Sequence, residues 1–394
     1  MTAPRTVSFD DTSIAFASRS NAELLKMYWL FALMNNNFLV KNGTPLLAAG
    51  IKIGLPVKFL VKPTIFSHFC GGETIQECES TIQQLGKYGV GTILDYSVEG
   101  EKNEATFDAT ANEIIATIDK AATTPAIPFS VFKVTGVAHS DLLQKAQDKK
   151  PLSSEEQAAL DRAWARVDRI CKHAHDKKVR IFIDAEETWL QDVIDDMADT
   201  MMERYNERHF IVYNTYQLYR HDRLEAIKKA YKKAQLGGYL IGGKLVRGAY
   251  MEKERKVAQA AGKPDPINPS KKATDDLFNE ALRFCIERLD RIAICAGTHN
   301  EESTYLLMDL MRQHHVKPSD DRIYFAQLLG MSDNISFNLA KAGYNVAKYV
   351  PYGPVEAVMP YLIRRANENT AIAGQSSREF NLIKKERERR KQAK

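Results

Sequence analysis

The segment Arg180-Ile-Phe-Ile-Asp184 is a short run of apolar and β-branched residues, and a long polar segment with helical periodicity follows it. The same alternation recurs along the chain from about residue 90 onward. Apolar runs that alternate with helices are typical of parallel strands buried on both faces of a sheet. The other candidate strands are residues 92–98, 130–134, 210–214, 243–247, 292–296, 322–326 and 345–350.

Eight strands with room for a helix in each gap predict an α/β fold, a TIM-type (βα)8 barrel. An open doubly wound sheet is the alternative, and it usually carries a G-x-G-x-x-G turn after its first strand. That motif is missing, and the glycine-rich segment 237–243 precedes a strand instead of following one. We therefore expect an N-terminal helical segment at 1–88 that packs on the barrel, the barrel itself at 89–383, and a basic C-terminal tail at 384–394.

The charge balance limits the kinds of partner. Of the 394 residues, 44% are hydrophobic and 27% are charged, as in ordinary globular chains. The formal net charge is +5, and residues 384–394 carry seven basic and two acidic side chains, so the rest of the chain is neutral. This distribution argues against a nucleic-acid-binding surface. The tail is either a solvated, frayed helix end or a basic handle for an anionic membrane surface.

The cysteines and the N-terminus indicate the compartment. The five cysteines are odd in number and form no C-x-x-C, which favours a reducing environment over a disulfide framework or a zinc site. Residues 1–20 resemble neither a secretory signal nor a transit peptide, and the apolar run 27–34 is too short to span a membrane. We expect a cytoplasmic, bacterial protein, with peripheral contact to the inner membrane as a further option.

The first 85 residues are predicted to be mostly helical, with one helix beginning after Ser20 or Asn21. The apolar stretch 45–66 carries scattered lysines and prolines. It either packs on a core or lies in a membrane interface, and its broken periodicity favours packing.

The active site of a (βα)8 barrel lies at the carboxyl ends of its strands. After the last strand, Gly353-Pro354 predicts the start of a helix. On that helix Tyr361, Arg364, Arg365 and Glu368 share one face, and two adjacent arginines form a fork for a carboxylate or a phosphate. The polar residues at strand ends are Asp95, Glu99, Lys133, Asp184, Glu186, Glu187, Asn214, Thr215, Gln217, Arg247, Tyr250, Thr298, His299, Asn300, Gln327 and Tyr349.

Each of these residues also has a structural interpretation. A polar side chain at a strand end is often a loop cap, His299 fits a structural histidine, and Arg364 and Arg365 fit surface ion pairs. The carboxylates between Asp184 and Glu187 would suit Mg²⁺ or Ca²⁺. Two other functions therefore stay open: a metal-dependent barrel enzyme with an Arg364/Arg365 anion site, and a non-enzymatic module that binds an acidic partner.

Six longer motifs occur between residues 244 and 369, and in this order they resemble the proline dehydrogenase (proline oxidase) family. The resemblance extends over about residues 90–370 and implies a distorted barrel that binds FAD without a Rossmann motif. The motifs are Lys244-Leu-Val-Arg-Gly-Ala-Tyr250, Asp265-Pro-Ile-Asn-Pro269, Thr298-His-Asn300, Tyr324-Phe-Ala-Gln-Leu-Leu-Gly-Met331, Lys348-Tyr-Val-Pro-Tyr-Gly-Pro354 and Tyr361-Leu-Ile-Arg-Arg-Ala-Asn-Glu-Asn369.

The resemblance implies a role for each matched residue. Lys133, Arg364 and Arg365 would bind the carboxylate of the substrate, and Asp184 would belong to the polar network of the site. The substrate ring would be enclosed by Tyr250, Leu328, Tyr349 and Tyr361. FAD would be held by Gln217, Lys244, Val246, Gly248, Ala249, Thr298, His299, Asn300 and Glu368.

The implied reaction is the oxidation of L-proline to Δ1-pyrroline-5-carboxylate by hydride transfer from C5 of proline to N5 of FAD, with a quinone as the electron acceptor. In the bacterial bifunctional members of the family, arginine stands at the position of Lys244, lysine at that of Arg247, and an aromatic residue at that of Met251. These differences indicate the monofunctional, eukaryote-like branch.

Tyr349 leaves little room for a 4-hydroxyl group, so we expect proline to be preferred over hydroxyproline. A hydroxyproline dehydrogenase of the same family is the alternative.

Overall fold

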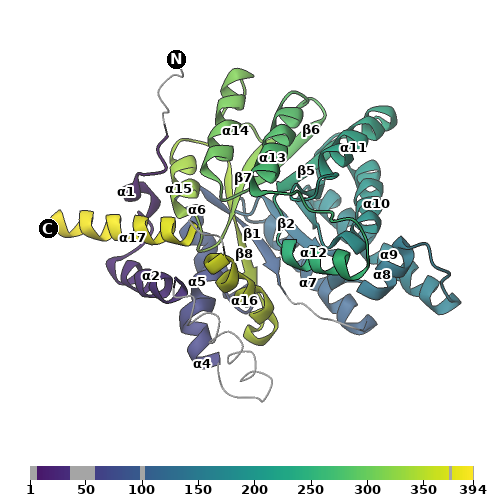
Figure 1. Cartoon of the computed structure of the whole chain (residues 1–394), viewed down its shortest axis with the longest axis horizontal. Coiled ribbons are helices and arrows are strands. Elements are labelled where there is room, and N and C mark those ends of the chain that lie inside the picture. Colours follow the sequence, from purple (N-terminus) through teal and green to yellow (C-terminus); the bar gives the residue numbers. More distant parts are fainter. Residues whose placement is uncertain (1–6, 36–57, 98–102, 372–374, 394) are drawn as a thin grey trace. The chain divides into compact units, whose positions relative to one another are not determined.

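The structure is a computed structural model that describes residues 7–35, 58–97, 103–371 and 375–393 (Figure 1). Eight parallel strands follow one another in chain order and form a closed barrel, which confirms the predicted (βα)8 fold. β3 has the bounds expected from its sequence. The strands are β1 Val90–Tyr96, β2 Phe129–Lys133, β3 Arg180–Asp184, β4 Val212–Gln217, β5 Ile241–Val246, β6 Ile292–Gly297, β7 Ile323–Leu328 and β8 Val346–Tyr352.

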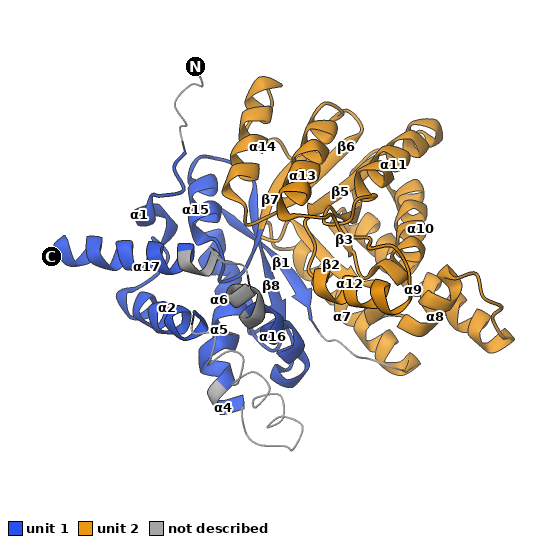
Figure 2. Ribbon diagram, in the orientation of Figure 1, with its two compact units in different colours: residues 1–99, 327–394 blue, residues 100–326 orange. Residues whose placement is uncertain are grey.

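The chain divides into two compact units, residues 1–99 with 327–394 and residues 100–326 (Figure 2). The first unit contains β1, β8, α1 Thr12–Ala15, α2 Asn21–Met34, α4 Lys58–Val61, the π-helix η1 Lys62–Phe66, α5 Ser67–Phe69, α6 Glu79–Gly86, α15 Asp333–Lys341, α16 Val355–Ala371 and α17 Gln375–Gln392. The second contains β2 to β6, the 3₁₀ turn η2 Val134–Gly136, α7 Glu104–Ala122, α8 Ser140–Gln147, α9 Ser154–Lys177, α10 Thr188–Tyr205, α11 Arg223–Gly237, α12 Met251–Ala260, α13 Lys271–Ile286 and α14 Glu301–Gln313. The domain limits near residues 89 and 384 stay a prediction.

Aromatic rings fill the inner face of the sheet in the second unit. Phe129 stacks on Phe182 with 4.3 Å between ring centroids, and Tyr213 meets Phe182 edge-on at 5.5 Å. Tyr324 of β7 contacts Phe129 at 4.9 Å. Rings from four strands can meet only on the concave side of the sheet, so this side is a packed core. Gly242 of β5 makes room for it, because a Cβ atom there would lie 2.3 Å from the Tyr213 ring.

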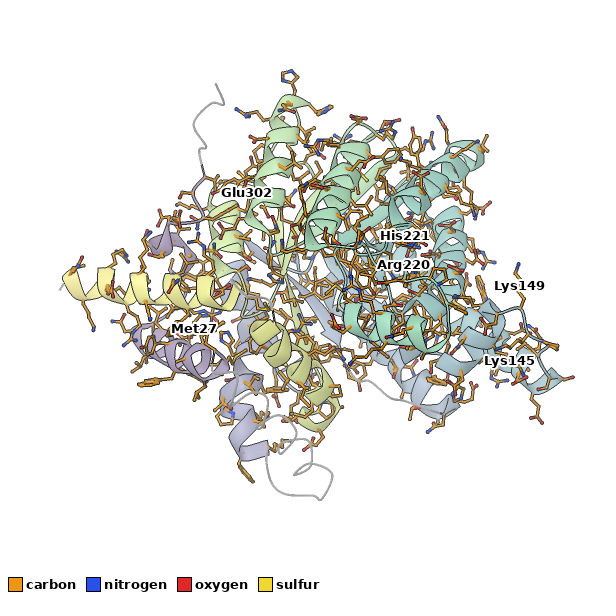
Figure 3. The ribbon with its side chains drawn as sticks, viewed as in Figure 1. Met27, Lys145, Lys149, Arg220, His221 and Glu302 are labelled. Carbon is orange, nitrogen blue, oxygen red and sulfur yellow. The ribbon has the colours of Figure 1, made fainter. Side chains whose placement is uncertain are left out.

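The N-terminal helices of the first unit pack against its C-terminal helix. As predicted, a helix follows Ser20, whose side chain accepts from the Glu23 backbone N–H while the Glu23 side chain accepts from the Ser20 N–H. Met27 of α2, labelled in Figure 3, is buried in one apolar cluster with Leu382 and Ile383 of α17. Chain segments separated by more than 350 residues in sequence thus share one core.

The last basic residues belong to α17 and are partly held in place. Glu386 is fully buried and forms ion pairs with Arg389 at 2.8 Å and with Arg390 at 2.7 Å. Arg390 also donates hydrogen bonds of 2.9 Å to the carbonyls of Arg19 and Phe16. Lys384 and Lys391 are exposed, so the segment is anchored at Glu386 and Arg390 and solvated elsewhere, and both interpretations of the tail stay predictions.

The apolar stretch 45–66 is described from residue 58 onward, and residues 45–57 lie outside the described part. Val61 and Phe66 are buried in an apolar cluster with Tyr361 and Leu362 of α16, so the described portion packs on a core as expected. Within the described ranges, no helix has both the length and the apolar character to cross a membrane. All five cysteines are buried free thiols.

Candidate active site

A buried ion pair lies at the carboxyl ends of β3 and β5. Lys244 is 4% exposed, and its ammonium group donates a short hydrogen bond to the Asp184 carboxylate. The same nitrogen lies 5.1 Å from the centroid of the Phe182 ring. Lys133 of β2 is the register partner of Asp184. β4 lies between β3 and β5, so the pair spans the inner face of the sheet and brings two predicted site residues together.

Gln217, at the end of β4, presents a buried acceptor toward this region. Its side-chain amide donates to the Glu186 carbonyl at 3.0 Å and to the Gln191 side chain at 2.9 Å. These two bonds fix the orientation of the amide, and within the described residues the buried Oε1 atom meets no donor. A buried polar atom of this kind requires a hydrogen-bond partner. An N–H of a heteroaromatic ring would satisfy it, so Gln217 and the neighbouring Lys244 fit the expected flavin.

The loop after β5 carries the next group of predicted residues. Val246 and Tyr250 are half-buried, whereas Gly248 and Ala249 are exposed. Gly248 has φ +128°, a conformation that side chains rarely adopt, and a Cβ atom there would lie 2.4 Å from the Tyr219 ring. The backbone of this loop is therefore open to a ligand on one side and rests on an aromatic ring on the other.

The predicted segment Thr298 to Asn300 is held by Arg247, a strand-end residue for which the family resemblance implies no binding role. Arg247 donates to the Thr298 hydroxyl at 2.6 Å and to Asp275 at 2.7 Å. Asn300 caps α14 by accepting from the Ser303 N–H at 2.9 Å. These bonds fix the turn that carries the half-buried His299. Thr298 and Asn300 thus have local structural partners in addition to any ligand.

The predicted substrate residues Leu328, Tyr349, Tyr361, Arg364 and Arg365 belong to the first unit. The α16 helix begins as expected, with Pro354 accepting from two of its first N–H groups. Arg365 is 7% exposed, and its guanidinium carbon lies 5.2 Å from the centroid of the buried Tyr361 ring. Leu328 packs against the apolar cluster that contains Tyr361.

The remaining members of this group are placed less completely. Arg364 is half-buried, and Tyr349 is buried with its carbonyl accepting from the Leu329 N–H at 2.8 Å. The side chain of Glu368 lies outside the described residues.

The three carboxylates after β3 point to three separate partners. Asp184 binds Lys244, Glu186 binds the backbone N–H and hydroxyl of Thr135, and Glu187 binds Lys253. A cation site needs oxygens that converge on one point. This arrangement gives the metal-dependent alternative no support.

Glu186 was one of several polar strand-end residues in the sequence, and its burial sets it apart. It is 4% exposed, and this burial raises the pKa of its carboxyl group to about 7, against the lowering effect of the Thr135 hydrogen bonds and the Lys133 charge. The clustering of carboxylates after β3 was the sequence signal, but only the packed structure distinguishes the buried member from its neighbours.

A family model described as "Proline dehydrogenase" matches residues 78–378 of the chain. The chain belongs to the proline dehydrogenase family. Membership of this family makes it an oxidoreductase by class. The strand-end residues and the α16 arginines described above all lie within the matched residues.

Curated relatives include two proteins named as proline dehydrogenases and one named for antibiotic biosynthesis. "Proline dehydrogenase 1, mitochondrial" of Dictyostelium discoideum is 33% identical over 426 residues, which cover 96% of the chain and 74% of that protein. "Carbapenem antibiotics biosynthesis protein CarD" of Pectobacterium carotovorum subsp. carotovorum is also 33% identical, over 82% of the chain and 84% of that protein. "Proline dehydrogenase 2, mitochondrial" of Arabidopsis thaliana is 32% identical over 84% of the chain and 79% of that protein.

Solved structures with a similar fold include proline utilization A (PutA) proteins. PutA from Bdellovibrio bacteriovorus has a TM-score of 0.74 at 19% identity, with 96% of the chain covered. PutA from Bradyrhizobium japonicum has a TM-score of 0.67 at 17% identity. The chain spans only 41% and 42% of these two proteins. At this identity the likeness shows the fold alone.

The raised pKa of Glu186 predicts a pH-dependent stability. Between about pH 4.5 and pH 7 the folded protein keeps a proton on Glu186 that the unfolded chain has lost. The free energy of unfolding therefore falls as pH rises through this window, by about 3 kcal/mol for this group, and levels off above it. Urea unfolding of the wild type and of Glu186→Gln at pH 5 and pH 8 measures the effect, and we expect the variant to lose this pH dependence. The exposed Glu155→Gln variant is the control, and an equal pH slope in all three proteins would contradict the assignment.

Proposed function

We propose that the protein catalyses the FAD-dependent oxidation of L-proline to Δ1-pyrroline-5-carboxylate, the first step of proline catabolism. The observation that carries this proposal is the buried Arg365 beside the Tyr361 ring on the helix after β8, in a chain of this family. A cation next to an aromatic wall suits a small amino acid whose body is an apolar ring and whose acid group is an anion.

The residues proposed to hold FAD lie mostly in the second unit. Gln217 offers its buried acceptor, Lys244 supplies a buried positive charge balanced by Asp184, and the exposed backbone at Gly248 permits close approach. The segment Thr298 to Asn300 and Glu368 would hold the remainder of the cofactor. When bound, FAD supplies the hydride acceptor for C5 of proline and passes the electrons to a quinone.

The residues proposed to bind proline restrict how it can lie. A guanidinium group presents two parallel N–H donors to a carboxylate. Arg364 and Arg365 would therefore set the orientation of the substrate and also balance its negative charge. Tyr349 and Tyr361 are both buried and would enclose the ring. Holding the reacting carbon in one place removes several kcal/mol of the activation barrier. The proposed contact between Lys133 and the substrate carboxylate stays a prediction from the family resemblance.

The flavin spectrum tests the reaction, and Arg365 tests the binding mode. We expect purified protein to be yellow and to bleach when proline is added without oxygen. Arg365→Ala should raise KM for proline by the equivalent of about 2–5 kcal/mol, because the substrate charge loses its buried partner. Arg365→Lys keeps the positive charge but loses the two parallel N–H donors. Its KM for proline should lie between the values of the wild type and Arg365→Ala.

An unchanged KM in Arg365→Ala would place the carboxylate elsewhere. Colourless protein that is stabilised by Mg²⁺ would instead support the metal-dependent alternative. Protein that responds to neither flavin nor metal would support a binding module.

Tyr349 provides a test of substrate preference. We expect kcat/KM for proline to exceed that for trans-4-hydroxy-L-proline, because the buried tyrosine limits the space beside the ring. Tyr349→Ser should raise the hydroxyproline-to-proline ratio of kcat/KM at least tenfold, whereas Tyr349→Phe removes only the hydroxyl group and should change it less. A wild-type ratio of one or more would favour the hydroxyproline alternative.

We also propose that the enzyme contacts an anionic membrane, where its quinone acceptor would reside, through the exposed cations of α17. Lys384 and Lys391 are exposed, unlike Arg390, which binds backbone carbonyls within the protein. The double variant Lys384→Gln/Lys391→Gln should pellet less with anionic vesicles at low salt than the wild type. Lys172→Gln/Lys272→Gln, with two exposed lysines of the second unit, is the matched control. Equal pelleting of all three proteins would remove α17 from the proposal.

A further inference from the structure

Glu254 is a buried carboxylate that none of the roles above uses. It lies on α12 and is 1% exposed. Its oxygens accept from the Thr188 backbone N–H at 2.8 Å, from the Thr188 hydroxyl, and from the Tyr219 hydroxyl at 3.2 Å. Burial of a carboxylate is costly unless several donors satisfy it, so this set of bonds holds the side chain firmly in one position.

The three donors come from the loops after two other strands. Thr188 begins α10, directly after the segment Asp184 to Glu187, and its N–H belongs to the positive end of the α10 dipole. Tyr219 follows β4 and lies two residues beyond Gln217. One side chain therefore ties α12 to the carboxyl ends of β3 and β4, where the predicted flavin and network residues lie.

The same contacts reach the loop after β5. The Glu254 N–H donates to the Tyr250 carbonyl at 2.8 Å and so closes the first turn of α12. The Tyr219 ring lies against Gly248, and the Tyr219 N–H donates to the Arg247 carbonyl at 2.7 Å. The Tyr219 ring thus packs against the loop at Gly248, while the Tyr219 hydroxyl group donates to Glu254.

We propose that Glu254 is a positioning residue that fixes the Gly248–Tyr250 loop in the conformation that receives the flavin. The proposal rests on the proposed function for the identity of the ligand. Its structural content, that one carboxylate joins three strand-end loops, is independent of that function.

Hydrogen exchange of the full chain and FAD titration together test this role. In Glu254→Ala we expect the amides of residues 247–254 to exchange at least tenfold faster than in the wild type, with α14 unchanged. The dissociation constant of FAD should rise at least tenfold, and kcat should fall more than KM for proline changes, because Arg365 is untouched. Glu254→Gln retains an acceptor and shape and should recover most of the loss.

Two controls separate the possible causes. Glu252→Ala removes an exposed carboxylate from the same helix and should behave as the wild type. Tyr219→Phe removes one donor but keeps the ring under Gly248, and should show a smaller effect than Glu254→Ala.

Unchanged exchange in the loop, or faster exchange spread evenly over the whole chain, would overturn the positioning role. If the wild-type protein binds no flavin or does not bleach with proline, the proposed function fails. The exchange measurement still decides whether Glu254 holds the loop in that case.

Discussion

The buried ion pair between Lys244 and Asp184 is the interaction on which the rest of the site depends. Both side chains lie toward the carboxyl ends of their strands, on the inner face of the sheet, where water is largely excluded. A charge in such a place must be paired, since an uncompensated ion there costs several kcal/mol. The pair therefore ties β3 to β5 across the intervening strand β4.

This polar end is possible because the opposite end of the same sheet is filled. Phe129, Phe182 and Tyr213 pack on one another along the inner face. Gly242 leaves space for the Tyr213 ring because it has no Cβ atom. An apolar floor keeps the interior dry and rigid. The strands can then present charged and amide groups at one end without loss of the core that supports them.

The loops at that end are joined by long polar side chains. Arg247 connects the end of β5 to the turn at Thr298, and Glu254 connects α12 to the loops after β3 and β4. Each such residue satisfies several donors or acceptors at once, so the removal of one partner leaves others unsatisfied. Loops that carry function can be held in this way without burying an apolar core of their own. Arg390 of α17 is held in a similar way, because its guanidinium group donates to the backbone carbonyls of Arg19 and Phe16.

The sequence by itself determined the features that local periodicity and local chemistry encode: eight apolar runs with helices between them, the helix start at Ser20, the helix after Pro354, and the family motifs. Only the tertiary structure decided which polar groups meet. Lys244 and Asp184 are 60 residues apart in sequence, and Glu254 is 66 residues from Thr188. Such pairings depend on the strand register and on the conformation of each loop. Neither property produces a periodic pattern in the amino-acid sequence. Burial has the same origin, and for this reason the sequence could not single out Glu186 among three carboxylates or show that Glu386 holds the tail.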